Sequence, residues 1–218
     1  DKVKALEDEK LQLYRQTMPA MPIRAMDLYP FKTDPTCCPK PKKFPRAMDL
    51  KISSVSGVYD VVALYNWNDT KSEKVLDLQE DLGLKNNTQY LVFDFWDKKL
   101  EGTSTLMIKQ EVPAHGTKAL IVKEVSDKPQ LLATSRHLTA AYSLLEMEWD
   151  NQENTLSGTS QTVPGDTYTL YIHIPDDYEF VAAEVQAEDY THSLKPGGML
   201  QVSFTGKEEP VEWQLSFK

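Results

Sequence analysis

The sequence predicts an all-β protein. We expect two consecutive antiparallel β-sandwich domains of the Greek-key or immunoglobulin-like kind, preceded by a short helix and a proline-rich extended segment. Three observations lead to this class. The 218 residues suffice for two sandwiches of roughly 90–100 residues each. From residue 47 onward the hydrophobic pattern has a period of two, and turn-forming Gly, Pro, Asn and Asp recur between the apolar runs. The expected divisions are a lead-in over 1–46, a first sandwich over 47–126 and a second over 127–218.

Residues 1–17 form the best helix candidate in the sequence. Val3, Leu6, Leu13 and Tyr14 share one apolar stripe, and charged residues cover the opposite side. An isolated amphipathic helix gains most of its stability from packing. We therefore expect this helix to lie on a partner surface.

The lead-in continues through residues 18–46, where seven prolines favour an extended chain. Unlike a free linker, this stretch is rich in apolar side chains, which predicts that it is laid across a surface. The residues expected to dock in this way are Met21, Ile23, Met26, Leu28, Tyr29 and Phe31. The pentapeptide RAMDL occurs at 24–28 and again at 46–50, either by coincidence or by a short duplication.

The first sandwich is predicted to contain strands at 47–54, 58–66, 73–78, 88–96, 104–111 and 117–125. The run at 58–66, VYDVVALYN, is nearly all apolar at its centre, as in a strand covered on both faces. Glu101-Gly102 and Pro113–Gly116 are interpreted as turns, and residues 79–87 as a short loop plugged by leucines.

The polar run Ser126–Pro129 marks the expected domain boundary. Beyond it we expect strands at 130–138, 142–149, 155–162, 167–174, 179–188, 199–205 and 210–217. The last of these alternates cleanly, so Val211, Trp213, Leu215 and Phe217 are predicted to face the core.

Charge and motifs exclude several function classes. The net charge is −9, and residues 51–218 carry 14 basic against 26 acidic residues. This argues against a nucleic-acid partner, because phosphates require a basic surface. No apolar run reaches 18 residues, so no membrane span is predicted. Dinucleotide, P-loop and serine-hydrolase motifs are absent, and we expect no cofactor.

Neither a metal site nor a catalytic residue is predicted. His115, His137, His173 and His192 are widely spaced, and the adjacent Cys37-Cys38 do not have zinc-ligand spacing. The cysteines are interpreted as ordinary thiols, with a strained vicinal disulfide as the alternative. Glycosidases need two opposed carboxylates. Pairs such as Glu146/Glu148 are instead typical of a solvated sheet face.

Trp67 is the candidate binding residue. It lies in the turn Asn66–Asp69 and is the tryptophan most expected to be exposed, where it could stack on a sugar ring, although packing is the alternative. Asn68-Asp69-Thr70 and Asn86-Asn87-Thr88 match the N-glycosylation pattern, which has no meaning in a bacterial protein.

A family resemblance follows from the runs MPIRAMDLYPF, FPRAMDLKISSVSGVYDVVALYNWND, YLVFDFWDKKLEGT and VPAHGTKALIVK. Together they resemble the C-terminal region of α-galactosidase-like (melibiase-like) bacterial glycoside hydrolases. In that family an extended segment leads from a (β/α)₈ barrel to a β-sandwich. The family-like turns are Asn66-Trp67, Asp94-Phe95-Trp96 and Pro113–Gly116.

The resemblance implies a non-catalytic accessory region that packs against a catalytic barrel of the same polypeptide. The catalytic carboxylates of the family lie on barrel strands, and no residue here matches them, so we expect this sequence to be a fragment that is not an enzyme alone. The alternative is a stand-alone carbohydrate-binding or cell-surface module with glycans as partners, and an independent small enzyme is a third reading. A periplasmic or extracellular location is implied by the resemblance only.

Overall fold

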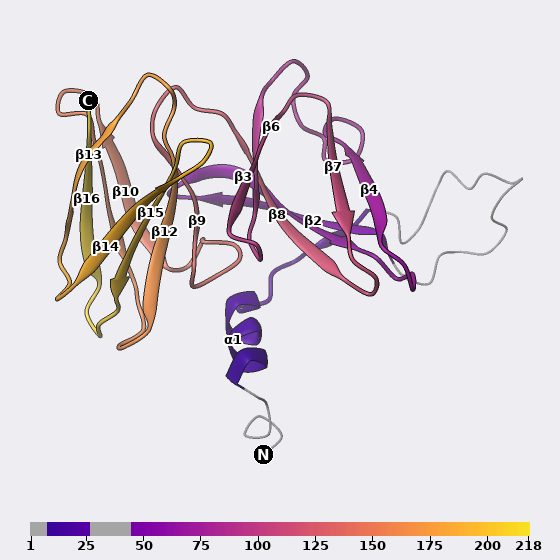
Figure 1. Ribbon diagram of the computed structural model, residues 1–218, viewed down its shortest axis with the longest axis horizontal. Helices are drawn as coiled ribbons and strands as arrows, with labels where there is room; N and C mark the ends of the chain where they lie inside the picture. The colour runs from indigo at the N-terminus through magenta and orange to yellow at the C-terminus, as the bar shows by residue number, and fades with distance from the viewer. Residues whose placement is uncertain (1–7, 27–44) are drawn as a thin grey trace, which may run out of the picture. The chain divides into compact units, whose positions relative to one another are not determined.

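The structure, a computed structural model, describes residues 8–26 and 45–218. These residues form an all-β protein with one short helix and antiparallel sheets in sandwich-like pairs, which confirms the predicted fold class (Figure 1). The chain divides into two compact units. We call the described residues within 21–51 and 59–125 the first sandwich, and those within 1–20, 52–58 and 126–218 the second sandwich.

The first sandwich pairs a six-stranded sheet with a two-stranded one. The large sheet has the order β1 (Arg24–Ala25), β2 (Ala47–Ser54), β3 (Gly57–Tyr65), β8 (Thr117–Glu124), β5 (Tyr90–Asp94) and β6 (Lys99–Ser104). The small sheet consists of β4 (Ser72–Asp77) and β7 (Met107–Val112). Val62 and Leu120 from the large sheet join Leu76 and Ile108 from the small one in a single buried cluster. Leu82 completes this core from the loop after β4, which confirms the plugged loop.

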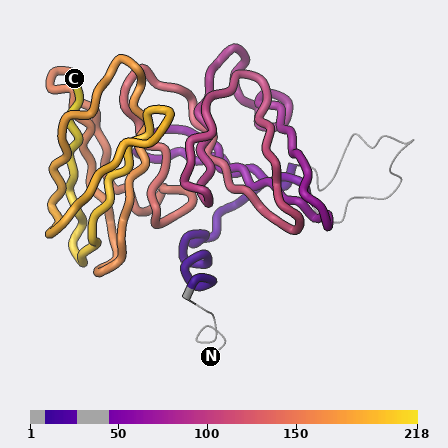
Figure 2. Tube along the Cα trace, viewed as in Figure 1, coloured from indigo at the N-terminus to yellow at the C-terminus, as the bar shows by residue number. Residues whose placement is uncertain are grey.

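The second sandwich consists of two four-stranded sheets. Its chain trace leads to the yellow C-terminal end in Figure 2. One has the order β10 (Leu144–Asp150), β11 (Thr155–Ser160), β16 (Val211–Phe217) and β13 (Phe180–Val185). The other has the order β14 (Tyr190–Lys195), β15 (Met199–Thr205), β12 (Thr167–His173) and β9 (Gln130–Thr134). The alternation predicted for the last strand is confirmed, because Val211, Trp213, Leu215 and Phe217 are all buried.

Gly158 shows how tightly this second core is packed. It pairs with Trp213 on the neighbouring strand, and a Cβ atom built on it would lie only 2.5 Å from the indole ring. The indole Nε1 donates a hydrogen bond to Ser160 Oγ at 3.0 Å, which satisfies its buried polar group. Any larger residue at 158 would therefore displace the tryptophan.

Helix α1 (Asp8–Thr17) is attached to the second sandwich by its C-terminal end. Gln16 Nε2 donates to Ser135 O at 3.0 Å, and Leu138 N donates to Gln16 O at 2.8 Å. His137 contributes hydrogen bonds with the backbone of Arg15 and Met18, while burial lowers the pKa of its imidazole. The Leu138 bond engages the Gln16 carbonyl, one of those that the helix end leaves without an intrahelical partner.

The two RAMDL copies contact each other, which the sequence did not reveal. Arg24 pairs with Asp49 and Ala25 with Met48 across β1 and β2, and Met26 N donates to Ala47 O at 3.1 Å. Met26 also packs against the first core. In this antiparallel register the arginine of one copy meets the aspartate of the other, and the two form an ion pair at 3.2 Å.

Besides the two-residue β1, two strands were missed by the sequence interpretation. Glu101-Gly102, expected to be a turn, lies inside β6, so that expectation was wrong. The register between β5 and β6 shifts at this point, and Gly102 has a φ of 117°, as a bulge requires of a glycine. Strand β14 was missed because its side chains are mostly exposed and give no apolar alternation.

Candidate functional site

The first motif of interest is the turn at Asn66. Its side-chain Nδ2, which has two N–H groups, lies within hydrogen-bond distance of three carbonyl oxygens, those of Thr70 at 2.8 Å, Val112 at 3.0 Å and Pro113 at 2.9 Å. Asn66 is buried, so these bonds satisfy an amide that water cannot reach. The side chain therefore ties the turn after β3 to the turn before β8, which is a structural role.

Trp67, the candidate binding residue, is half exposed, at 50%. Its ring stacks on Tyr65, with ring centroids 5.5 Å apart, and its Nε1 donates to Pro45 O at 2.8 Å. One face of the indole and its only polar atom are thus engaged within the first sandwich. The exposed part of the ring presents a small apolar surface to solvent.

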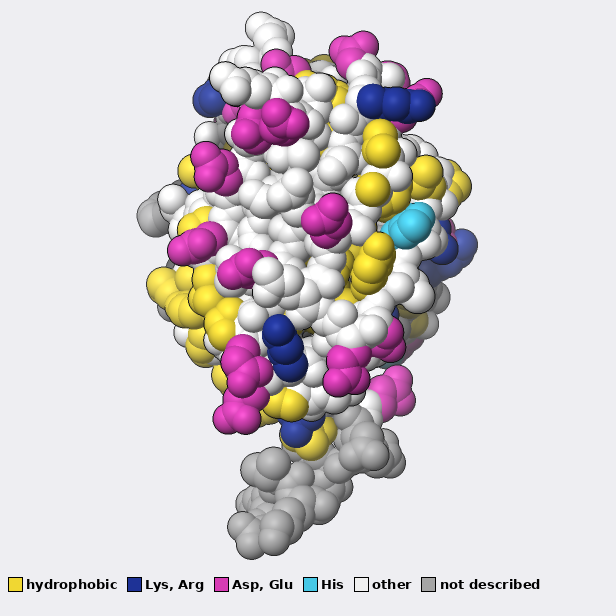
Figure 3. Space-filling view, turned by 90° about the vertical axis from the view of Figure 1, so that its left-hand side faces the viewer, with side chains coloured by type: hydrophobic (Ala, Val, Ile, Leu, Met, Phe, Trp, Pro, Cys, Tyr) yellow, Lys and Arg dark blue, Asp and Glu magenta, His cyan; other side chains and the backbone are white. Residues whose placement is uncertain are grey.

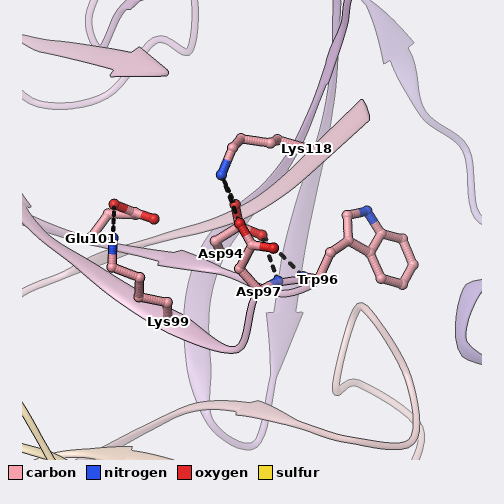
Figure 4. Close-up of polar contacts among 6 residues, drawn as sticks. All are labelled: Asp94, Trp96, Asp97, Lys99, Glu101 and Lys118. Carbon is pink, nitrogen blue, oxygen red and sulfur yellow. Dashed lines mark hydrogen bonds and ion pairs between the residues drawn. The ribbon is translucent and has the colours of Figure 1, made fainter. Parts of the chain in front are cut away.

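The second motif, Asp94-Phe95-Trp96, centres on a carboxylate that is completely buried (Figure 4). Asp94 Oδ1 accepts hydrogen bonds from the backbone N–H groups of Trp96 at 3.0 Å and Asp97 at 3.2 Å, and Lys118 Nζ lies 2.5 Å from Oδ2. Lys118 also binds Asp97 at 3.0 Å. Figure 4 shows the indole of Trp96 directed away from this ion pair.

The pKa of Lys118 reflects this environment. Burial is the largest single influence and lowers it, but hydrogen bonds and charge from Asp94 and Asp97 together outweigh burial and raise the pKa above its usual value. The group thus stays an ammonium and closes the β5–β6 turn onto β8. This buried ion pair stabilises the fold. Because both charged groups are engaged with each other, neither is available as a nucleophile or a base.

The residues expected to dock on a partner surface occupy different environments. Met21 and Met26 are half-buried, and Met26 packs on the first core, whereas Ile23 is 47% exposed. On α1, Leu13 and Tyr14 are exposed as well. Leu28, Tyr29 and Phe31, together with Cys37 and Cys38, lie outside the described residues.

A groove on the second sandwich was not anticipated by the sequence interpretation. It lies along the sheet β10-β11-β16-β13 and has a volume of about 920 Å³. Strand register places Glu146, Thr159 and Glu212 in one row across β10, β11 and β16, and Gln186, the residue after β13, donates its backbone N–H to Glu212 O at 2.9 Å. A second row holds Glu148, Ser157, Gln214 and Glu184.

The groove is rich in hydrogen-bond acceptors. Four glutamates and two glutamines line it, and none of the described lining residues is Lys, Arg or His. Gln186 Nε2 donates to Glu212 Oε2 at 2.6 Å, which orients one carboxylate. Figure 3 shows the same acidic bias over one face of this unit, where Asp and Glu side chains are spread and basic ones are few. The alternation of Glu146 and Glu148 indicated a solvated face, but only the register brings Glu184 and Glu212 beside them.

Metal binding finds no support among the described residues, which contain no group of three or more His, Cys, Asp or Glu able to hold an ion. His115 Nε2 is hydrogen-bonded to Asp69 at 2.9 Å, and His192 lies beside the Phe180 ring.

Within the described part of the chain, no helix has the length and apolar character to cross a bilayer.

Comparison with known proteins gives one family match. Residues 53–122 match the family model described as alpha galactosidase C-terminal beta sandwich domain. Among solved structures, the chain is similar to alpha-galactosidase I from Mortierella vinacea, with 20% identity, a TM-score of 0.30, and 35% of this chain and 20% of that chain covered. It is also similar to an isomalto-dextranase from Arthrobacter globiformis T6 complexed with panose, with 14% identity, a TM-score of 0.32, and 79% of this chain and 34% of that chain covered.

The chain therefore spans about a fifth of the length of the alpha-galactosidase and about a third of the length of the isomalto-dextranase. No curated protein matches the sequence. The matched residues 53–122 contain the Asn66, Asp94 and Pro113–Gly116 turns on which the resemblance rested. This segment of the chain accordingly matches the family of alpha galactosidase C-terminal beta sandwich domains.

Proposed function

We propose that the chain is a non-catalytic C-terminal accessory region of a glycoside hydrolase, and that it packs against and braces a (β/α)₈ catalytic barrel encoded upstream. The observation that carries the proposal is the family match of residues 53–122, a domain described as the C-terminal part of alpha galactosidases. The buried Asp94–Lys118 pair and the Asn66 turn fit a structural role. On this reading the chain alone hydrolyses no glycoside.

Exposed apolar side chains of the lead-in support the bracing role. Leu13 is 45% exposed and Tyr14 is 54% exposed, although both stand on a helix whose C-terminal end is fixed by Gln16. Ile23 is similarly exposed next to β1, which is itself held to β2. Fixed apolar side chains in water gain free energy when a partner covers them, at about 25 cal/mol per Å² of apolar area. We propose the upstream barrel as that partner.

Replacing Leu13 and Tyr14 with serine should separate docking from folding. In the chain alone we expect a change in thermal midpoint of no more than about 2 °C, because both side chains already face water. In the polypeptide that includes the upstream domain, we expect the catalytic domain to unfold at a lower temperature, as measured by scanning calorimetry and residual hydrolase activity.

The matched control is Val181→Ser, which removes an equally exposed apolar side chain from β13. If the double variant and the control behave alike in the longer polypeptide, the docking role is wrong. An upstream reading frame without a barrel would reject the whole proposal.

A second candidate function, carbohydrate binding, is favoured by the groove on β10-β11-β16-β13. A sugar is rich in hydroxyl donors, and the two rows of carboxylates and amides provide acceptors across four strands, a span of about 14 Å. The absence of basic groups among its described lining residues disfavours anionic glycans. Trp67 belongs to the other sandwich and would be a separate contact.

Calorimetric titration of the chain with neutral oligosaccharides tests this candidate. We expect weak binding that falls at least about tenfold, a loss of at least about 1.4 kcal/mol, in a Glu148→Ala/Gln214→Ala variant. Binding should be unchanged in Trp67→Ala, and sulfated oligosaccharides should not bind. Binding that disappears in Trp67→Ala and persists in the groove variant would move the site to the first sandwich.

A further inference from the structure

Two buried aspartates lie on adjacent strands of the first sandwich. Asp49 on β2 and Asp60 on β3 are each only 2% exposed. Neither belongs to the alpha-galactosidase-like turns described above. A carboxylate removed from water in this way is costly unless it is fully paired, so the contacts of both groups need to be accounted for.

The nearby cations do not supply a hydrogen-bond donor to every oxygen atom of the two carboxylates. Lys51 Nζ lies 2.5 Å from Asp60 Oδ1 and also donates to Leu82 O at 2.8 Å. Arg24 Nη2, from β1, lies 3.2 Å from Asp49 Oδ2 and also donates to Asp81 O. Both cations are more than half exposed. Among the described residues, none donates a hydrogen bond to the buried Asp49 Oδ1.

The remaining charged groups near the pair are engaged elsewhere. Asp81, in the loop that covers this end of the sheet, accepts from Arg46 at 3.3 Å and from Asp77 N at 2.9 Å. On β8, Val122 is the partner of Asp60, and Glu124 two residues further on binds Lys85 at 2.9 Å. The described groups thus leave Asp49 Oδ1 as an acceptor without a donor.

A proton on Asp60 would supply that donor. The protonated carboxyl has one O–H group, and Asp49 is the neighbour whose charge and hydrogen bonding act on Asp60. We infer that Asp49 and Asp60 share one proton, and that binding of this proton makes the first sandwich more stable in mildly acidic than in neutral solution.

Electrostatics agree with this geometry. Burial is the main influence on Asp60, the Lys51 hydrogen bond opposes it, and repulsion from Asp49 adds to it, so that the pKa of Asp60 rises from 3.8 to about 6. A carboxyl whose folded pKa exceeds its unfolded value contributes stability below the unfolded pKa, and that contribution is lost as the pH rises through the folded pKa. The window for this group is therefore from about pH 4 to about pH 6.

Carbon-13 NMR titration of the aspartate carboxyl groups in the intact chain tests the shared proton directly. We expect the Asp60 carbon to titrate at about pH 6 in the wild type. An Asp60 carbon that titrates in the usual range of about pH 3 to 4.5 would overturn the inference.

Hydrogen exchange in β2 and β3 provides a second readout. On going from pH 7 to pH 4.5 we expect the opening equilibrium of these strands, corrected for intrinsic exchange, to fall on the order of tenfold in the wild type. In Asp60→Asn, which keeps a donor for Asp49 without a titrating group, that change should be absent. The control Asp177→Asn, at an exposed turn, should retain it. Equal pH profiles in wild type and Asp60→Asn would reject the stabilising role of the proton.

Discussion

Replacing Asp94 by alanine should lower the free energy of unfolding of the first sandwich by about 3–5 kcal/mol, the range found when one partner of a buried ion pair is removed. The change removes the acceptor of two backbone N–H groups and the closest partner of Lys118, whose side chain is only 15% exposed. Asp97 keeps one contact with Lys118, which favours the lower end of that range. Urea denaturation, combined with hydrogen exchange in β5 and β8, measures the effect.

Two matched variants distinguish the causes. Asp94→Asn keeps a side-chain oxygen for the two N–H groups and loses only the charge, so we expect about half of the alanine effect. Glu101→Gln breaks the more exposed Lys99–Glu101 pair shown beside it in Figure 4 and should cost less than about 1 kcal/mol. An alanine variant no weaker than Glu101→Gln would show that Asp94 is not a structural anchor.

Replacing Lys123 by methionine should stabilise the first sandwich at pH 7 by about 1–3 kcal/mol. Lys123 on β8 is 7% exposed, its Nζ lies 5.4 Å from the centre of the Tyr59 ring, and burial lowers its pKa from 10.5 to about 8. A depression of that size corresponds to about 3 kcal/mol, and loss of the contact with the ring offsets part of the gain.

The pH dependence has a definite sign. Between about pH 8 and pH 10.5 the unfolded chain binds more protons at Lys123 than the folded chain, so the wild type should gain stability as the pH rises through this window. The methionine variant should lack that gain. Lys109→Met, at an exposed position on β7, should keep the wild-type slope. A Lys123→Met protein less stable than wild type at pH 7 would contradict the prediction.

These residues show which features of the candidate site can be predicted from the sequence. The Asn66, Asp94 and Pro113–Gly116 motifs were visible in the sequence, and their resemblance to the alpha galactosidase C-terminal domain is confirmed over residues 53–122. What each motif does was not visible, because Val112 is 46 residues from Asn66 and Lys118 is 24 residues from Asp94. The interior aspartate of VYDVV was a sequence signal for a buried carboxyl, but its partner Asp49 was identified only by the pairing of β2 with β3.

The sequence by itself determined the all-β class, most strand positions and the inward face of β16, because these follow from local periodicity and turn chemistry. Tertiary structure alone decided the pairing of the two RAMDL copies, the bulged strand β6, the glutamate rows of the groove and the carboxyl pair Asp49–Asp60. Each of these depends on the register between paired strands, and a shift of one residue would turn every side chain to the other face. Periodicity is encoded locally, whereas register is set by the packed core.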